Sequence, residues 1–279
     1  HAYLTDSELL SGADSRAGVE GMREFRAAFK TLKDVHMEPA WDQKLKEFYE
    51  TKLIPPLAKN LESNPMVEQY LPTDTATRYL QYHYIANNPA PYQEGQNLPF
   101  ATDGSVWSAV HRKYHSAFGK VANMFGFTDM YLVDAETMDI VYSYQKTSEF
   151  GTNLETGPYA DTNVANMVQG RAQGVVAPRA FIGSPIFDGF RMIGIMVFQF
   201  PLDEINRIMT GNYEWEREGL GKTGEVYAVG RDFTLRSRSR FMYENPKGFL
   251  QALRDNGVAD SIISQIQFLG TAVMALPAK

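Results

Sequence analysis

The chain has 279 residues, of which 44% are apolar, and this is enough for one large domain or two ordinary ones. Its net charge is −6 and its basic residues are spread along the chain instead of forming a run, which argues against a nucleic-acid-binding surface. It has no cysteine, which excludes disulfides, thiolate metal sites and a cysteine nucleophile.

Apolar residues recur at helical spacing through the first third of the chain. The rhythm runs over residues 25–32 and again over residues 41–61, which predicts two helices. The adjacent prolines Pro55 and Pro56 are expected to kink or end the second helix. A possible capping box, Thr5-x-x-Glu8, precedes both.

Two more helices are predicted over residues 74–86 and 104–125, separated by the proline-containing break at residues 87–91. The longer one carries an apolar side built from Val106, Val110 and further residues at the same spacing. Such stripes indicate helix packing.

The pattern changes to short strands after residue 126. Residues 129–134 and 140–146 are predicted to form a hairpin, because Tyr142 and Tyr144 alternate with other residues along the second strand. A helix over residues 161–173 and a second hairpin, 179–187 with 192–200, follow it. The order strand, strand, helix, strand, strand, helix predicts an antiparallel α+β unit.

The last third starts a second unit of the same kind. A hairpin, two helices and a final strand are predicted, over residues 225–230 with 233–237, 246–255, 259–268 and 271–276. These strands are too few to close a stable sheet, so we expect this unit to be incomplete in the chain. The expected domains are residues 1–125 (helical, with a long stalk helix), 126–212 and 213–279.

The stretch GLGKTGEVYAVG contains glycines in the G-x-G-x-x-G pattern, at Gly219, Gly221 and Gly224. In a dinucleotide-binding unit this pattern follows a strand and opens a helix, whereas here a helix precedes it and a strand follows. A P-loop would need a glycine where Glu216 stands, and no kinase motifs follow. We therefore expect no nucleotide here, and assign these glycines to a turn between two modules.

His111 and His115 lie one helical turn apart, as metal ligands often do. A zinc protease would need a glutamate where Arg112 stands, so that class is not indicated. A two-histidine metal site with a distant carboxylate stays open as an alternative to structural or pocket-lining histidines. The basic run from Arg236 to Arg240 is short and is expected to anchor the fold.

Aromatic side chains and one cation gather around the end of the second predicted strand. Tyr142, Tyr144 and Lys146 share a strand face, and Tyr159 and the 111–115 segment, with Tyr114 and His115, could converge on it. Aromatic walls with a cation are typical of a site for an anionic or zwitterionic small molecule. The alternative is a packed tyrosine cluster with a solvated lysine.

Six segments in consistent order resemble the double-Cache sensor domain of bacterial transmembrane receptors. They are YLQYHYIANNP (79–89), VHRKYH (110–115), DMYLVDAETMDIVYSYQKTSEFGTNLETGPY (129–159), FIGSPIFDG (181–189), FQFPLDEINRIMT (198–210) and GLGKTGEVYAVGRDFTLRSRSRF (219–241). The match covers about residues 48–241. It is most similar to sensors of adenylate or guanylate cyclases and chemoreceptors.

The resemblance implies a long N-terminal helix followed by two PAS-like modules, of which the membrane-distal one binds the ligand. The binding residues that it implies are Tyr142, Tyr144, Lys146, Phe150, Tyr159 and Phe181. The sequence departs from the amino-acid-binding variant, since residues 147–150 read Thr-Ser-Glu-Phe where that variant has an Arg-x-Trp-Tyr-like set. A second departure concerns residues 170–180, where relatives carry a longer segment, so either this loop is short or residues are missing from it.

The expected function is therefore an extracytoplasmic, periplasmic ligand-sensing domain without catalytic residues, metal or cofactor. Its partners would be an anionic or zwitterionic small molecule and a second copy, paired through the N-terminal helices. No apolar run approaches the ~18 residues that span a bilayer, so membrane segments and any cyclase or kinase output would lie outside this piece. A structural or dimerisation module and, less favoured, a metal-dependent hydrolase are the alternatives.

Overall fold

The computed structural model describes residues 16–60, 65–92, 94–170, 179–201, 207, 210–226, 239–260 and 262–263. Its contacts divide the chain into two compact units, His1–Gln169 with Phe181–Gln199, and Gly170–Ala180 with Phe200–Lys279. The domain boundary expected at residue 126 lies inside the first unit, because helices of the first third pack directly on the sheet.

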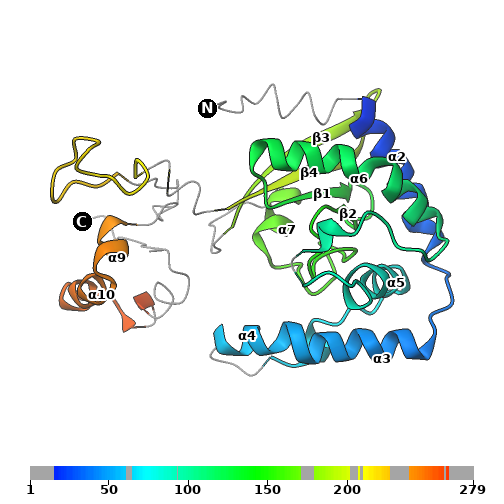
Figure 1. Ribbon diagram of the computed structural model, residues 1–279, viewed down its shortest axis with the longest axis horizontal. Helices are drawn as coiled ribbons and strands as arrows, with labels where there is room; N and C mark the ends of the chain where they lie inside the picture. The colour runs from blue at the N-terminus through cyan, green and yellow to red at the C-terminus, as the bar shows by residue number, and fades with distance from the viewer. Residues whose placement is uncertain are drawn as a thin grey trace. The chain divides into compact units, whose positions relative to one another are not determined.

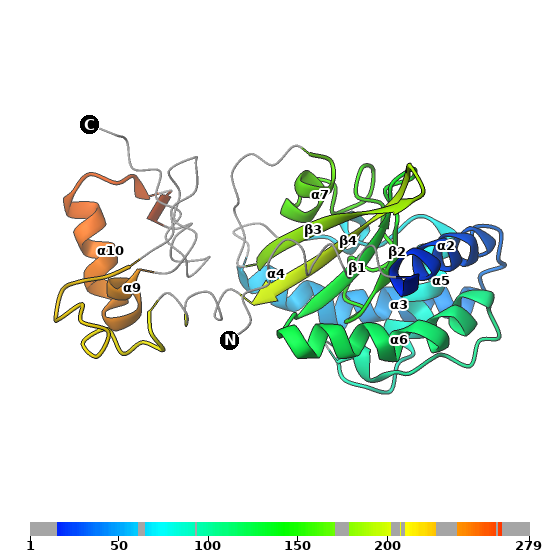
Figure 2. The same ribbon diagram turned by 90° about the horizontal axis from the view of Figure 1, so that it is seen from above.

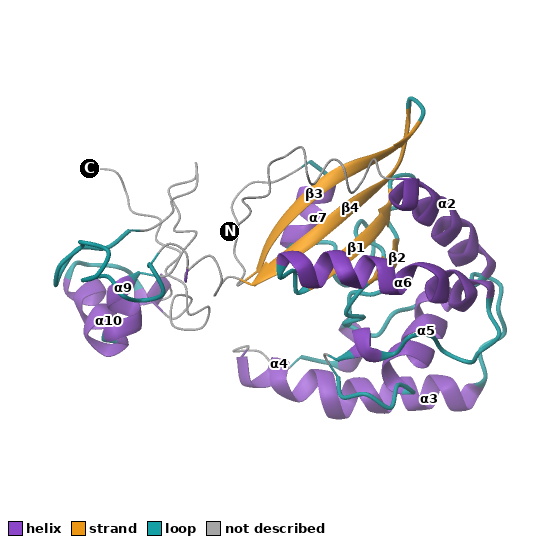
Figure 3. Ribbon diagram, turned by 45° about the horizontal axis from the view of Figure 1, so that its top comes forward, coloured by secondary structure: helices purple, strands orange, loops and turns teal. Residues whose placement is uncertain are grey.

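An antiparallel sheet forms the centre of the first unit (Figure 3). Its strands are β1 (Asp129–Asp134), β2 (Ile140–Ser143), β3 (Arg179–Asp188) and β4 (Arg191–Pro201), in the order β2-β1-β4-β3. All of β1 is buried, because it is central and covered on both faces. The sheet with its helices, including a helix near the N-terminus, confirms the predicted α+β class.

Helices α2 (Arg16–Thr31) and α6 (Val106–Phe125) cover one face of the sheet. Leu132 of β1 pairs with Tyr142 of β2, and the Tyr142 ring lies 4.8 Å from that of Phe25 on α2. The Ser105 hydroxyl caps α6 by accepting the N–H of Ser108 at 3.0 Å. The predicted helix at 104–125 is confirmed.

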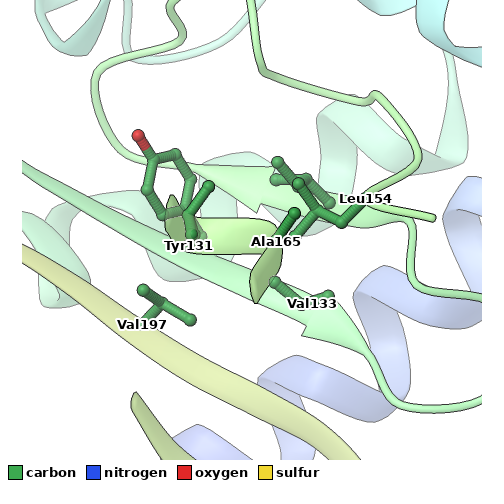
Figure 4. Close-up of a cluster of buried hydrophobic side chains, with 7 residues drawn as sticks. Tyr131, Val133, Leu154, Ala165 and Val197 are labelled. Atoms are coloured by element: carbon green, nitrogen blue, oxygen red, sulfur yellow. The ribbon is translucent and has the colours of Figure 1, made fainter. Parts of the chain in front are cut away.

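The short helix α7 (Asn163–Val168) covers the opposite face (Figure 2). A second apolar cluster lies under it (Figure 4). Tyr131 and Val133 of β1 point into it because they alternate with the residues that face α2. Its buried members are Tyr131, Val133, Ile140, Leu154, Val164, Ala165 and Val197. The helix predicted over 161–173 ends earlier, since Gly170 takes a left-handed φ of 69°.

A helical layer lies beside the sheet. It contains α3 (Pro39–Phe48), the π-helical turn η1 (Tyr49–Leu53) and α4 (Ile54–Asn60), which Figure 1 shows as one continuous rod. Pro55 and Pro56 therefore do not end the helix. They lack the N–H groups that α-helical bonding to residues 51 and 52 would need, and the turn before them has the wider π register.

The same layer holds α5 (Thr75–Gln81), extended by the π-helical turn η3 (Tyr82–Ala86). This confirms the helix predicted over residues 74–86. The 3-10 turns η2 (Val67–Gln69) and η4 (Gly95–Asn97) lie in the connecting segments.

The second unit contains α9 (Arg240–Glu244) and α10 (Pro246–Asp255), the latter as predicted. Leu250, Leu253 and Ile263 form its small apolar cluster. The predicted helix at 202–210, the third hairpin, the last strand and the capping box at residue 5 fall largely or wholly outside the described residues. Across the part that the structure describes, no helix has both the length and the apolar character to cross a membrane.

Candidate functional site

A buried carboxylate holds a sharp turn where β2 ends. Asp129 Oδ1 accepts the backbone N–H of Gln145 at 2.9 Å, and its carboxylate also accepts the Ser143 hydroxyl. That hydroxyl in turn accepts the N–H of Lys146 at 2.8 Å. The strand predicted over 140–146 stops at Ser143, because the N–H groups of Gln145 and Lys146 bond to side chains instead of a neighbouring strand.

The turn places the Lys146 amine in the interior, with a left-handed φ of 58° and a residue exposure of 1%. Its Nζ donates to the carbonyl of Tyr144 at 3.0 Å and lies 5.8 Å and 5.9 Å from the ring centroids of Tyr84 and Tyr142. Burial lowers the pKa of Lys146 to about 7, and the charge of Asp129 opposes that shift. The alternative of a packed tyrosine cluster with a solvated lysine therefore does not describe Lys146, which is buried.

Carbonyl groups fix the tautomers of two imidazoles from α6. His115 Nε2 lies 2.8 Å from the carbonyl of Gln96, which can only accept, so Nε2 carries the proton and Nδ1 accepts the Tyr142 hydroxyl at 2.8 Å. His111 Nδ1 donates to the carbonyl of Pro99 at 2.9 Å, which leaves its Nε2 as a buried acceptor without a partner. Burial and the nearby lysine lower the pKa of His115 to about 4 and that of His111 as well, so both rings are neutral at pH 7.

The other aromatic residues predicted nearby pack the helix-covered face. The ring of Tyr144 lies 5.4 Å from that of His115, and Phe150 is fully buried. Tyr114 belongs to the contact between α2 and α6, where its hydroxyl donates to Glu24 at 2.9 Å. These side chains pack against one another and fill the space between the sheet and the helices.

Two of the predicted site residues lie elsewhere. Phe181 packs against Tyr131 in the cluster under α7, so the sheet separates it from Lys146. Tyr159 lies in the loop before α7, where burial raises its pKa and the groups of Tyr49 and Glu149 add to that shift. The structure therefore brings together His115, Tyr142, Tyr144, Lys146 and Phe150, whereas Tyr114, the residue before His115, faces α2.

A polar pocket of about 270 Å³ opens beyond the end of α2. Four segments border it: Lys33 after α2, residues 72–76 at the start of α5, Asp139 in the β1–β2 turn, and the loop at residues 152–158. None of the predicted site residues borders it.

The pocket combines one ammonium group with two carboxylates. Lys33 Nζ lies 3.3 Å from Asp139 Oδ2, and the other oxygen of Asp139 accepts the side-chain amide of Asn153 at 2.7 Å. Asp74 caps α5 by accepting the N–H of Thr77 at 2.8 Å. Threonine hydroxyls complete the polar wall, and prolines and an alanine supply apolar surface. A small molecule with charges of both signs fits this arrangement.

Sequence patterns pointed to only one side of this pocket. The segment after the second predicted strand, which follows Lys146, supplies Thr152 and Asn153. Lys33, Asp74 and Asp139 follow or precede different elements, and no local spacing connects them. The nearest signal was the predicted helix start at residue 74, which gives Asp74 a structural role.

The glycine segment of the second unit forms turns, as predicted. Gly219 and Gly221 have left-handed φ values of 82° and 61°. Arg240 donates to the carbonyls of Gly221 and Gly224 at 2.8 Å and 2.9 Å, and its guanidinium lies 4.9 Å from the ring centroid of Trp215. Arg240 therefore anchors the fold, as expected of this basic segment.

Across the described residues, no group of three or more histidine, aspartate or glutamate side chains is arranged to hold a metal ion. The rings of His111 and His115 stack with centroids 4.2 Å apart. Comparisons with protein-family models, curated proteins and solved structures found no match to this chain.

Proposed function

We propose that the first unit is a ligand-sensing module and that the pocket beyond α2 is its binding site. The observation that carries this proposal is the placement of Lys33, Asp74 and Asp139 around one cavity of about 270 Å³. Binding pockets of roughly 300–1,000 Å³ commonly combine apolar walls with a few oriented polar groups, and this one lies near the lower limit. The resemblance to double-Cache sensors supports the same function from the sequence.

The charges favour a small zwitterion. Lys33 offers an ammonium group to an anionic end, and the carboxylates of Asp74 and Asp139 accept an ammonium group from the ligand. Lys33 is half exposed, so its present ion pair with Asp139 is screened and easily exchanged for a ligand.

The pocket also suits a sensor because of the segments that it joins. Lys33 directly follows α2, which packs on the sheet, and Asp139 lies in the turn between two strands of that sheet. A ligand that takes over either group changes how the end of α2 is held. The available energy is the difference in the ligand's affinity for the two arrangements.

In this proposal the chain is the non-enzymatic, extracytoplasmic part of a bacterial inner-membrane receptor. Its ligand is a small molecule, it pairs with a second copy through the N-terminal helices, and the helix movement is the signal. The pocket replaces the aromatic cluster as the proposed ligand site, because that cluster is filled by its own side chains.

Thermal unfolding with a panel of small zwitterions, and with size-matched neutral alcohols and simple anions, tests the proposal. A ligand at about 100 times its Kd stabilises the folded chain by roughly 2.7 kcal/mol. We expect a zwitterion to raise the melting temperature of the unmodified chain. Asp74→Asn and Asp139→Asn should abolish that rise, and asparagine keeps the helix cap at residue 74.

Glu155→Gln is the matched control, because Glu155 lies in the same loop but does not border the pocket. It should keep the full response. If no compound stabilises the chain, or if the two aspartate variants respond like the control, the pocket is not the binding site and the structural-module alternative gains ground.

A further inference from the structure

Lys146 differs from the other lysines that the structure describes, because its side chain is enclosed. Lysine is almost never fully buried unless it is paired with a carboxylate. Across the described residues, no carboxylate oxygen lies within 4.0 Å of Lys146 Nζ, and its one hydrogen bond goes to the carbonyl of Tyr144. The pocket beyond α2 does not use this residue.

The groups that face this amine come from four elements. They are Asp129 on β1, Tyr142 on β2, His111 and His115 on α6, and Tyr84 on η3. Both imidazoles are neutral, and the Asp129 carboxylate accepts hydrogen bonds from the turn, from the N–H of Gln145 and the hydroxyl of Ser143. Apart from Asp129, the groups that face the amine are uncharged, and enclosure away from water is what favours an uncharged nitrogen over an ammonium ion here.

A small cavity of about 10 Å³ borders Lys146, with room for one water molecule. Tyr84, Asn88, Tyr92 and Gly95 also border it and form its cover. This cover is closely fitted, since a Cβ at Gly95 would lie 2.4 Å from the carbonyl oxygen of Gln145. The cavity gives the amine a small reaction space.

We propose that Lys146 is a covalent binding site for a very small aldehyde, of one or two carbons, held as an imine. The amine nitrogen attacks the carbonyl carbon and forms a carbinolamine. The C–O bond then breaks, and the oxygen leaves as water with the two hydrogens that the nitrogen gives up. No oxidant, reductant or metal is needed.

The surroundings favour an imine over other adducts. An imine carries no charge, so it avoids the cost of keeping an ammonium ion away from water in this enclosed site. A carbamate formed with carbon dioxide would instead place a negative charge in this enclosed site, near the carboxylate of Asp129. This site is separate from the zwitterion pocket, and its existence does not depend on that pocket.

Limited reductive methylation of the full chain tests the proposal. The folded protein is treated with limiting formaldehyde and cyanoborohydride at pH 7, 8 and 9, and modification of Lys146 and of exposed Lys120 is measured by peptide mass spectrometry. The pKa of Lys146 is lowered to about 7, whereas that of ordinary exposed lysines is near 10.4. The ratio of Lys146 to Lys120 modification should therefore be highest at pH 7 and fall roughly fifty-fold by pH 9.

Two controls distinguish modification of Lys146 inside its folded cavity from modification of a lysine that is simply exposed to solvent. In denaturant the ratio should approach one at every pH, because both lysines are then solvated. A bulky aromatic aldehyde should modify Lys120 in the folded chain and leave Lys146 untouched, because the cavity is water-sized. The proposal is overturned if formaldehyde leaves Lys146 unmodified at pH 7, if the ratio does not change with pH, or if the aromatic aldehyde modifies Lys146 equally well.

Discussion

Asp129 shows how one side chain can set the course of the backbone. Its Oδ1 accepts the N–H groups of Met130, Tyr144 and Gln145 at 2.7–2.9 Å, and its carboxylate also accepts the Ser143 hydroxyl. Burial raises its pKa to about 6, and the backbone donors oppose that shift, so it is ionised at neutral pH. Without this acceptor, several buried donors would lose their partner.

Replacing this carboxylate therefore gives a graded result. Asp129→Ala should lower the free energy of unfolding by about 3 kcal/mol, because it leaves buried N–H groups unsatisfied. Asp129→Asn keeps an acceptor oxygen at Oδ1, so it should lower the free energy of unfolding clearly less than Asp129→Ala does. Urea unfolding at pH 7.5 measures both, and equal losses would show that the acceptor oxygen is not what holds the turn.

Lys146 links the stability of the fold to pH. Burial lowers its pKa from 10.5 to about 7, so between these values the unfolded chain binds a proton that the folded chain does not. The free energy of unfolding should therefore rise with pH in this window, by about 1.4 kcal/mol per pH unit for one group. This contribution is lost as the pH falls through about 7.

Urea unfolding at pH 7, 8 and 9 measures this slope. Lys146→Met should remove it, because methionine has no proton to bind, and Lys120→Met should leave it unchanged because Lys120 is exposed. Identical slopes in the unmodified chain and Lys146→Met would show that the amine stays charged in the folded state.

At the scale of the elements, α2 is held to the sheet by two ion pairs of different burial. Arg26 Nε lies 2.7 Å from the carboxylate of Asp134, whose side chain is 3% exposed. Arg23 pairs with Asp188 at the tip of the β3–β4 hairpin, where both side chains are largely in solvent. The two arginines lie on the same helix, but both members of the Arg26 pair are more buried than those of the Arg23 pair.

Arg26→Met should lower the free energy of unfolding by roughly 3 kcal/mol, because it leaves a buried carboxylate without its cation. Arg23→Met should lower the free energy of unfolding much less, because exposed ion pairs are screened by water and salt. Chemical denaturation of both variants in low salt makes the comparison. If Arg23→Met were as harmful as Arg26→Met, the difference in burial would not be the cause.

The elements themselves were largely predictable, because each follows from local periodicity. The α+β class came from the order of the predicted strands and helices, and the helices at residues 74–86, 104–125 and 246–255 came from local patterns, such as the apolar side of 104–125 and the proline-containing break after residue 86. The end of β2 could not be predicted, because it depends on Asp129, which lies 14 residues before Ser143. The pocket could not be predicted for the same reason, because Lys33 and Asp139 meet only through the packing of α2 on the sheet.

At the scale of the whole molecule, the chain has two compact units with separate apolar cores. Leu132 is fully buried in the first unit, and Leu253 belongs to the cluster of the second. Each unit also holds a buried tryptophan, Trp107 in the first and Trp215 in the second. Because each core is built from its own residues, we expect the units to unfold in separate transitions.

Fluorotryptophan incorporation gives three fluorine NMR signals, two from the first unit (Trp41 and Trp107) and one from the second (Trp215). Leu132→Ala should remove roughly 2–5 kcal/mol of stability from the first unit and shift the urea midpoint reported by Trp107, leaving that of Trp215 in place. Leu253→Ala should do the reverse. If either substitution moved both midpoints together, the units would share one cooperative transition, and a ligand bound beside Lys33 would then stabilise the second unit as strongly as the first.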